Sequence, residues 1–167
     1  WKHGILQDLH KCGLRGRLPV FISNFLALRN FRVRVGSCLS DLHNQEAGVP
    51  QGCILSVTLF ILKINSIVKC LLSNIKCSLF VDDFLICYRS RNMNSIERLL
   101  QLCLNNIQNW ADRNVFQFSK TKTVCMHFCQ QRTLHTDPQF TLDGAAIPIV
   151  NEFKFLLNCI EFQLIRV

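Results

Sequence analysis

Two adjacent carboxylates, Asp82 and Asp83, are the residues of this chain whose chemistry is most informative. Apolar runs flank them at residues 77–80 and 84–88, so the pattern predicts a β-hairpin with the aspartates at its tip or just inside it. Adjacent carboxylates repel each other, and we expect a divalent cation or a basic side chain to neutralise them. Taken alone, such a pair is more often a solvated turn.

A glycine-rich loop, Gly48-Val49-Pro50-Gln51-Gly52, lies upstream of the aspartates and precedes a long apolar stretch. Gly48 and Gly52 would let another molecule approach the backbone closely, which side chains at those positions would obstruct. Pro50 would stiffen the loop, and Gln51 can form hydrogen bonds there. The alternative interpretation is a plain loop that caps the next helix.

Two further segments follow the aspartates: Phe-Ser-Lys-Thr-Lys-Thr at residues 118–123 and Phe-Lys-Phe-Leu at residues 153–156. Together with the glycine loop and the aspartate pair, they form an ordered set that resembles motifs B, C, D and E of a reverse transcriptase. The resemblance is to the non-LTR retrotransposon type, often named after the jockey mobile element, and it covers nearly the whole chain.

The resemblance implies an α+β fold, namely a partial reverse-transcriptase palm in which helices pack on an antiparallel sheet, with the start of the thumb connection. Residues 1–130 would form the partial palm. Residues 131–167 would form the palm edge, the primer-grip hairpin and a truncated thumb connection.

The same resemblance implies an RNA-directed DNA polymerase, a nucleotidyltransferase that extends a DNA primer on an RNA template with deoxynucleoside triphosphates. Two Mg²⁺ ions, or Mn²⁺ in their place, would serve the reaction. Asp82 would be the direct metal ligand, and Asp83 a supporting or occasional one. Lys122 would protonate or neutralise the pyrophosphate leaving group, and an ordinary surface lysine in a basic turn with Lys120 is an equal alternative.

Further residues would contact the nucleic acid. The loop residues Gly48, Pro50, Gln51 and Gly52 would contact the template and the incoming nucleotide. Phe153, Lys154 and Phe155 would place the primer terminus, unless they form an amphipathic strand at the palm edge. Arg32, Arg34 and Lys120 are candidates for the nucleic-acid backbone, and a solvated polar face is the alternative for the arginines.

The chain departs from the family pattern in two places. The first catalytic aspartate, in motif A, would lie on a strand just before Trp1, and Asp8 falls inside a helix and is not assigned that role. Leu157 stands where the family usually has glycine. We therefore expect a fragment that is inactive by itself. The alternatives are a degenerate or domesticated nucleic-acid-binding module without catalysis and, with less support, a metal-dependent phosphohydrolase.

Composition agrees with a nucleic-acid partner. The chain has 167 residues, 49% of them hydrophobic, which allows one sizeable core, and its net charge of +8 favours a polyanion. An anionic membrane surface would also attract this charge, but Lys63, Asn65 and Lys69 interrupt the most apolar segment, so a core helix is predicted there and no membrane partner. No obligate protein partner is inferred.

The ten cysteines show no CxxC pairs, which favours a reduced, intracellular protein without disulfides; the resemblance implies the nucleus and cytoplasm. Cys125, His127 and Cys129 alternate along a predicted strand, but a fourth metal ligand at zinc spacing is not apparent, so ordinary strand positions are favoured.

Periodicity predicts the elements that must position these residues. Helices are expected at residues 4–12, 19–30, 53–72 and 94–110, with Pro19 at a first helical position and Asn94 and Glu97 as a capping box. Strands are expected at residues 31–35, before a Gly36-Ser37 turn, and at 115–119 and 124–129. A terminal hairpin is expected around Asp143-Gly144.

Overall fold

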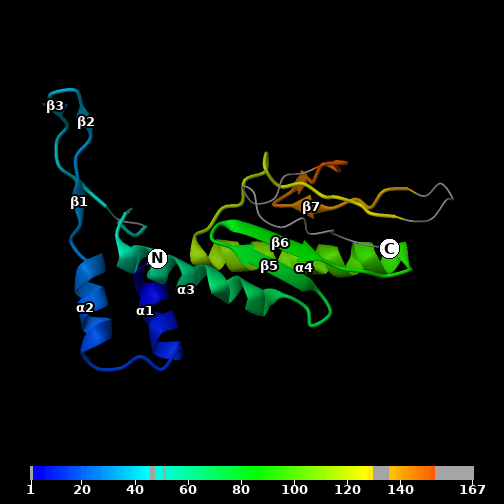
Figure 1. The fold of residues 1–167 in the computed structure, drawn as a ribbon, viewed down its shortest axis with the longest axis horizontal. Coiled ribbons are helices and arrows are strands. Elements are labelled where there is room, and N and C mark those ends of the chain that lie inside the picture. Colours follow the sequence, from blue (N-terminus) through cyan, green and yellow to red (C-terminus); the bar gives the residue numbers. More distant parts are fainter. Residues whose placement is uncertain (1, 46–47, 51, 130–135, 153–167) are drawn as a thin grey trace. The chain divides into compact units, whose positions relative to one another are not determined.

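The computed structural model describes residues 2–45, 48–50, 52–129 and 136–152. The chain divides into two compact units, Trp1–Asn65 and Ser66–Val167, and each is described by itself. Figure 1 shows the elements in chain order. The division reflects where contacts are dense, so the domain boundary expected at residues 130 and 131 stays a prediction.

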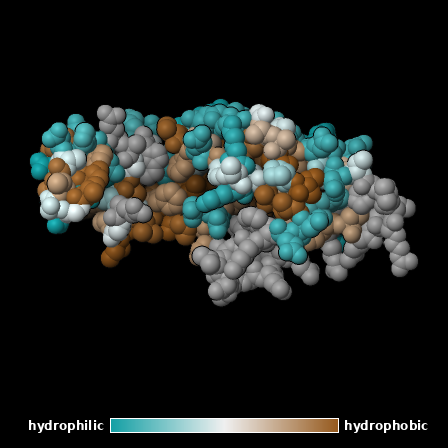
Figure 2. Space-filling view, turned by 90° about the horizontal axis from the view of Figure 1, so that it is seen from above, coloured by the Kyte–Doolittle hydropathy of each residue, from teal (hydrophilic) through white to brown (hydrophobic). Residues whose placement is uncertain are grey.

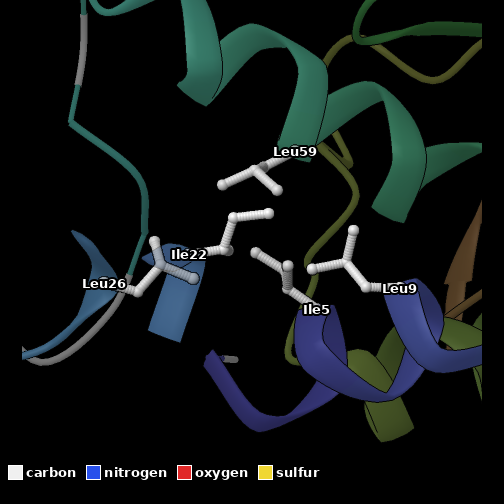
Figure 3. Close-up of a cluster of buried hydrophobic side chains, with 5 residues drawn as sticks. All are labelled: Ile5, Leu9, Ile22, Leu26 and Leu59. Carbon is white, nitrogen blue, oxygen red and sulfur yellow. The ribbon is translucent and has the colours of Figure 1, made fainter. Parts of the chain in front are cut away.

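The first unit packs three helices: α1 (Lys2–Lys11), α2 (Arg17–Leu26) and α3 (Ile54–Ile64). Their apolar residues recur at helical spacing and meet in one core, shown in Figure 3. This core consists of Ile5, Leu9, Ile22, Leu26 and Leu59.

Helix α2 ends earlier than predicted. Leu28 adopts a positive φ of 49° and is 96% exposed, so no packing holds the chain in a helix beyond Leu26. Pro19 is the third residue of the helix, where the prediction placed it first. Its missing N–H costs nothing there, because the first turn has no intrahelical acceptors for its N–H groups.

A β-ribbon follows α2 and is built from four two-residue strands: β1 (Asn30–Phe31), β2 (Arg34–Val35), β3 (Cys38–Leu39) and β4 (His43–Asn44). Strand β1 pairs with β4, and β2 pairs with β3 around the predicted turn, where Gly36 has a φ of 60°. The half-exposed strand predicted at residues 31–35 is wrong: it is broken into β1 and β2, and both of its faces are exposed.

The apolar segment predicted as one core helix, at residues 53–72, divides into α3 and a 3₁₀ helix, η1 (Asn65–Cys70). The second unit continues with the predicted hairpin, β5 (Lys76–Phe80) paired with β6 (Asp83–Cys87). Helix α4 (Met93–Asn114) comes next. It buries an apolar stripe that consists of Ile96, Leu100, Cys103, Ile107 and Trp110.

The capping box predicted for α4 is wrong by two residues. The side chain of Asn92, not Asn94, accepts a hydrogen bond from the Ser95 backbone N–H at 3.3 Å. Glu97 accepts instead from the Gln139 backbone N–H, also at 3.3 Å, because tertiary packing brings residue 139 to this end of the helix.

The strand predicted at residues 115–119 does not form. Val115 takes a left-handed conformation, with a φ of 58°, and closes the C-terminus of α4, which turns the chain away from an extended path. Phe116 then stacks on Trp110, with ring centroids 5.1 Å apart. Of the strand predicted at 124–129, a single parallel bridge between Cys125 and Ile149 is present.

The terminal hairpin is confirmed in the described residues. Strands β7 (Thr141–Leu142) and β8 (Ala145–Ala146) pair around Asp143 and Gly144, whose φ angles of 49° and 70° fit a type I′ turn. Helix α4 packs against β7. Leu142 of β7 and Phe140, which directly precedes the strand, are buried.

The surface is mixed in polarity. Figure 2 shows hydrophobic side chains lying among hydrophilic ones on one face of the molecule. None of the described helices is both long and apolar enough to cross a membrane.

Candidate functional site

The aspartate pair lies at the tip of the β5–β6 hairpin. Val81 and Asp82 form the two-residue turn, and Asp83 opens β6 opposite Phe80. Both carboxylates are exposed, and among the described residues neither makes a hydrogen bond or an ion pair. Unpaired carboxylate oxygens are the donors that Mg²⁺ and Mn²⁺ prefer, so the donor chemistry of this tip fits such an ion.

The Gly48–Gly52 loop belongs to the first unit. Gly48 and Gly52 have φ angles of 81° and 84°. Among the described residues, a Cβ atom built on Gly48 would lie 3.8 Å from Gln45 Nε2, and one built on Gly52 would have no neighbour within 4 Å. The backbone conformation therefore favours glycine at both positions, and the described residues leave space beside them. Val49 packs against the helical core and anchors the loop. Gln51 lies outside the described residues.

The lysines of residues 118–123 have different surroundings. The segment forms a tight turn in which the Ser119 carbonyl accepts from the backbone N–H and the hydroxyl of Thr123, at 3.0 and 2.7 Å. Lys120 Nζ lies 2.7 Å from the Asp143 carboxylate and ties the turn to the β7–β8 hairpin. Lys122 is exposed and makes no ion pair with any described residue. Of the two, Lys122 is the more available to a ligand.

The remaining predicted contacts are distributed over the chain. Arg32 and Arg34 are exposed on the ribbon of the first unit, and Arg34 Nε donates to the Gly36 carbonyl at 3.0 Å. The primer-grip residues Phe153, Lys154 and Phe155 lie outside the described residues, as does Leu157.

The segment with Cys125, His127 and Cys129 contains a polar pair and no metal cluster among the described residues. His127 Nδ1 lies 2.8 Å from the Asp137 carboxylate, and burial raises the pKa of the neighbouring Cys125 thiol, with the Asp137 charge adding to the rise. Across the described ranges no three His, Cys, Asp or Glu side chains are grouped to hold a metal ion.

Three polar residues with specific contacts were missed from the sequence. Arg29 binds the Gly48 carbonyl, Lys63 is buried against Asp8, and Gln101 binds the backbone of Thr141. Of the three, only Lys63 could have been singled out from the sequence, because a charged residue within a predicted apolar helix must find a partner. The contacts of the other two depend on tertiary packing.

Comparison with known proteins gives a consistent result. The model of the family described as reverse transcriptase (RNA-dependent DNA polymerase) matches residues 1–156. The probable RNA-directed DNA polymerase from transposon X-element of Drosophila melanogaster is 31% identical over 140 residues, which are 81% of this chain and 15% of that protein. The RNA-directed DNA polymerase from mobile element jockey of Drosophila funebris is 25% identical over 162 residues, 93% of this chain and 17% of that protein.

The chain thus spans about a sixth of the length of these curated relatives, as the 15% and 17% coverages show. No solved structure gives a significant match.

Proposed function

Because this chain belongs to the reverse transcriptase (RNA-dependent DNA polymerase) family, we propose that it forms part of the polymerising site of a retrotransposon RNA-directed DNA polymerase. The whole protein would extend a DNA primer on an RNA template with deoxynucleoside triphosphates. The observation that carries the proposal is the exposed Asp82–Asp83 tip on a tight hairpin, whose carboxylates no described residue engages, since nucleotidyl transfer needs carboxylates that remain available to metal.

Asp82 and Asp83 would hold Mg²⁺, which when bound activates the primer hydroxyl and neutralises charge on the triphosphate. Asp82 belongs to the turn, whereas Asp83 is committed to the register of β6. The turn residue is freer to direct its carboxylate outward, which supports Asp82 as the direct ligand and Asp83 as the supporting one.

Gly48, Pro50, Gln51 and Gly52 would meet the template and the incoming nucleotide. Gly48 and Gly52 have open space beside them, so a base pair could approach the backbone there. Lys122 would donate a proton or positive charge to the leaving pyrophosphate, a role that its exposed ammonium supports. Phe153, Lys154 and Phe155 would place the primer end, with Arg32 and Arg34 on the nucleic-acid backbone.

A metal titration tests the site. We expect Asp82→Asn to weaken Mn²⁺ binding, measured by electron paramagnetic resonance, by at least about tenfold, because even groups that only support a metal ligand contribute that much. Asp83→Asn should weaken it less. Asp41→Asn is the matched control, since it removes the same charge from an exposed residue of the ribbon. Equal losses in all three variants would refute the assignment.

A binding measurement separates the polymerase from the non-catalytic module. If the chain is part of a polymerising site, its affinity for an RNA–DNA hybrid with a recessed primer end should rise with Mn²⁺ and deoxynucleoside triphosphate, and Asp82→Asn should abolish that rise. Salt-dependent binding that does not change with Mn²⁺ or with deoxynucleoside triphosphate would favour the non-catalytic nucleic-acid-binding module. Primer extension by the same chain tests the expectation that it is inactive alone.

A further inference from the structure

Arg29 joins the base of the β-ribbon to the Gly48–Gly52 loop within the first unit. Its guanidinium Nη2 donates to the Gly48 carbonyl at 2.6 Å, and its own carbonyl accepts from the Gln45 backbone N–H at 2.7 Å. The side chain and the main chain of one residue therefore hold the segment that leads into the loop on both sides of residues 46 and 47.

The hydrogen bonding of this guanidinium is incomplete. Within the described part of the chain, Arg29 Nε and Nη1 are buried and have no hydrogen-bond partner, and no acidic side chain forms an ion pair with the residue. Among the described residues, the Gly48 carbonyl is therefore the acceptor that the Arg29 side chain contacts.

The entry to the loop is held at two places. Gly48 has a positive φ angle, which glycine adopts at little cost, and the next residue, Val49, packs on the helical core. A charge-assisted hydrogen bond to the Gly48 carbonyl fixes the direction in which the chain enters the loop.

We propose that Arg29 is a positioning residue for the nucleic-acid site: it fixes the direction in which the chain enters the glycine loop, through the Gly48 carbonyl, and keeps a positive charge at that entry. The link to nucleic acid rests on the proposed function, whereas the orientation of the loop entry does not. The positive charge of Arg29 also favours the approach of a polyanion.

Two substitutions test the proposal. Arg29→Met removes every donor and the charge at similar length, whereas Arg29→Lys keeps the charge and one donor for the Gly48 carbonyl. Arg15→Met is the matched control, because Arg15 lies in the same unit and donates to the His10 and Leu14 carbonyls, away from the loop.

The first readout is backbone amide hydrogen exchange of the free chain. We expect Arg29→Met to speed exchange of the Gln45 N–H, which donates to the Arg29 carbonyl beside the loop, by about tenfold or more, the factor that corresponds to one charged hydrogen bond. Arg29→Lys should change it little and Arg15→Met not at all. The urea midpoint of Arg29→Met should stay close to that of the parent chain, because the contact that is lost lies at the loop entry and not in the helical core.

Unchanged exchange in Arg29→Met would overturn the proposal. So would faster exchange spread over the whole unit with a lower urea midpoint, which would mark Arg29 as merely structural, or an Arg29→Lys variant as altered as Arg29→Met.

The second readout is affinity for an RNA–DNA hybrid at fixed salt, which Arg29→Met should weaken more than Arg15→Met does. If the parent chain binds no hybrid, the proposed function fails, while the exchange result still decides whether Arg29 orients the loop.

Discussion

Val81 lies at the first of the two turn residues between β5 and β6, with a φ of 54°. A two-residue hairpin turn with a positive φ at this position normally has glycine there, and a β-branched residue in this conformation is a genuine outlier. Such strain costs about 1–3 kcal/mol. It lies directly beside Asp82, so the turn that carries the candidate ligand is held in a conformation that the valine itself disfavours.

Relief of this strain is a direct test. We expect Val81→Asn to raise the free energy of unfolding by about 1 kcal/mol, because asparagine tolerates a positive φ better than valine. Urea unfolding measures the change. Val33→Asn is the control, since Val33 is similarly exposed, at 54% against 47% for Val81, and does not have a positive φ. Equal effects of the two substitutions would contradict strain at Val81.

At the scale of elements, Gln101 connects α4 to the β7–β8 hairpin. Its amide nitrogen donates to the Thr141 carbonyl at 3.0 Å, and its amide oxygen accepts from the Thr141 N–H at 2.9 Å. The side chain thus pairs with strand β7 as a neighbouring peptide group would. Because two-residue strands are weak alone, the helix supplies part of the stability of this hairpin.

Removal of the amide should loosen the hairpin. We expect Gln101→Leu to destabilise the second unit by about 1–2 kcal/mol, since both Thr141 groups lose their partner. Hydrogen exchange at Thr141 should quicken. Gln108→Leu is the control, because Gln108 lies on the same helix and donates to Asp112 of that helix, at 2.8 Å, rather than to the hairpin. If Gln101→Leu leaves exchange at Thr141 unchanged, the amide does not support the strand.

Helices α1 and α3 are joined by a buried ion pair. Lys63 Nζ lies 2.9 Å from Asp8 Oδ2, and Lys63 is only 4% exposed. A Cβ atom on Gly4 would lie 2.8 Å from Lys63 Nζ, so the glycine makes room for the ammonium. Loss of one partner would leave a buried charge uncompensated.

The pair should therefore show strong coupling. We expect Asp8→Leu to destabilise the protein by about 3 kcal/mol and the double variant Asp8→Leu, Lys63→Met to recover most of that loss. Lys11→Met is the control, because Lys11 contacts Asp8 at 3.6 Å from an exposed position. Thermal unfolding of the parent chain, of Asp8→Leu, of Lys63→Met and of the double variant completes the cycle, and additive effects would show that the pair is not coupled.

At the scale of the whole molecule, the described cysteines differ in burial. Burial raises the pKa of the Cys70, Cys87 and Cys103 thiols, as it does for Cys125. Folding therefore favours their neutral form, and their contribution to stability is fully present below the unfolded thiol pKa of about 8.5. That contribution is lost as the pH rises through the higher folded-state values.

Stability should consequently fall between about pH 8 and 9.5, the range in which unfolded thiols ionise first. Urea midpoints across this range measure the fall. A variant with alanine at the partly buried Cys70, Cys87 and Cys125 should show a shallower fall than one with alanine at the exposed Cys12, Cys38 and Cys77. Parallel slopes would contradict the role of burial.

Much of this protein could be predicted from its sequence. Local periodicity and turn chemistry were sufficient for the helix near residues 4–12, the Asp82–Asp83 hairpin, the Asp143–Gly144 hairpin and the apolar stripe of α4. The ordered motifs were sufficient to predict the reverse transcriptase family, which the match over residues 1–156 confirms. These features depend on residues that lie close together in the chain, so their local conformational preferences are sufficient to predict them.

Only the tertiary structure decided which polar groups are engaged and which remain available. The local sequence does not show which of the neighbouring lysines Lys120 and Lys122 is engaged by the protein itself, but the structure shows Asp143 paired with Lys120. The partners of Arg29, Lys63 and Gln101 lie 19, 55 and 40 residues away. Packing of whole elements brings such groups together, and because a buried charge or amide must find a partner wherever the fold provides one, no local pattern of residues predicts these contacts.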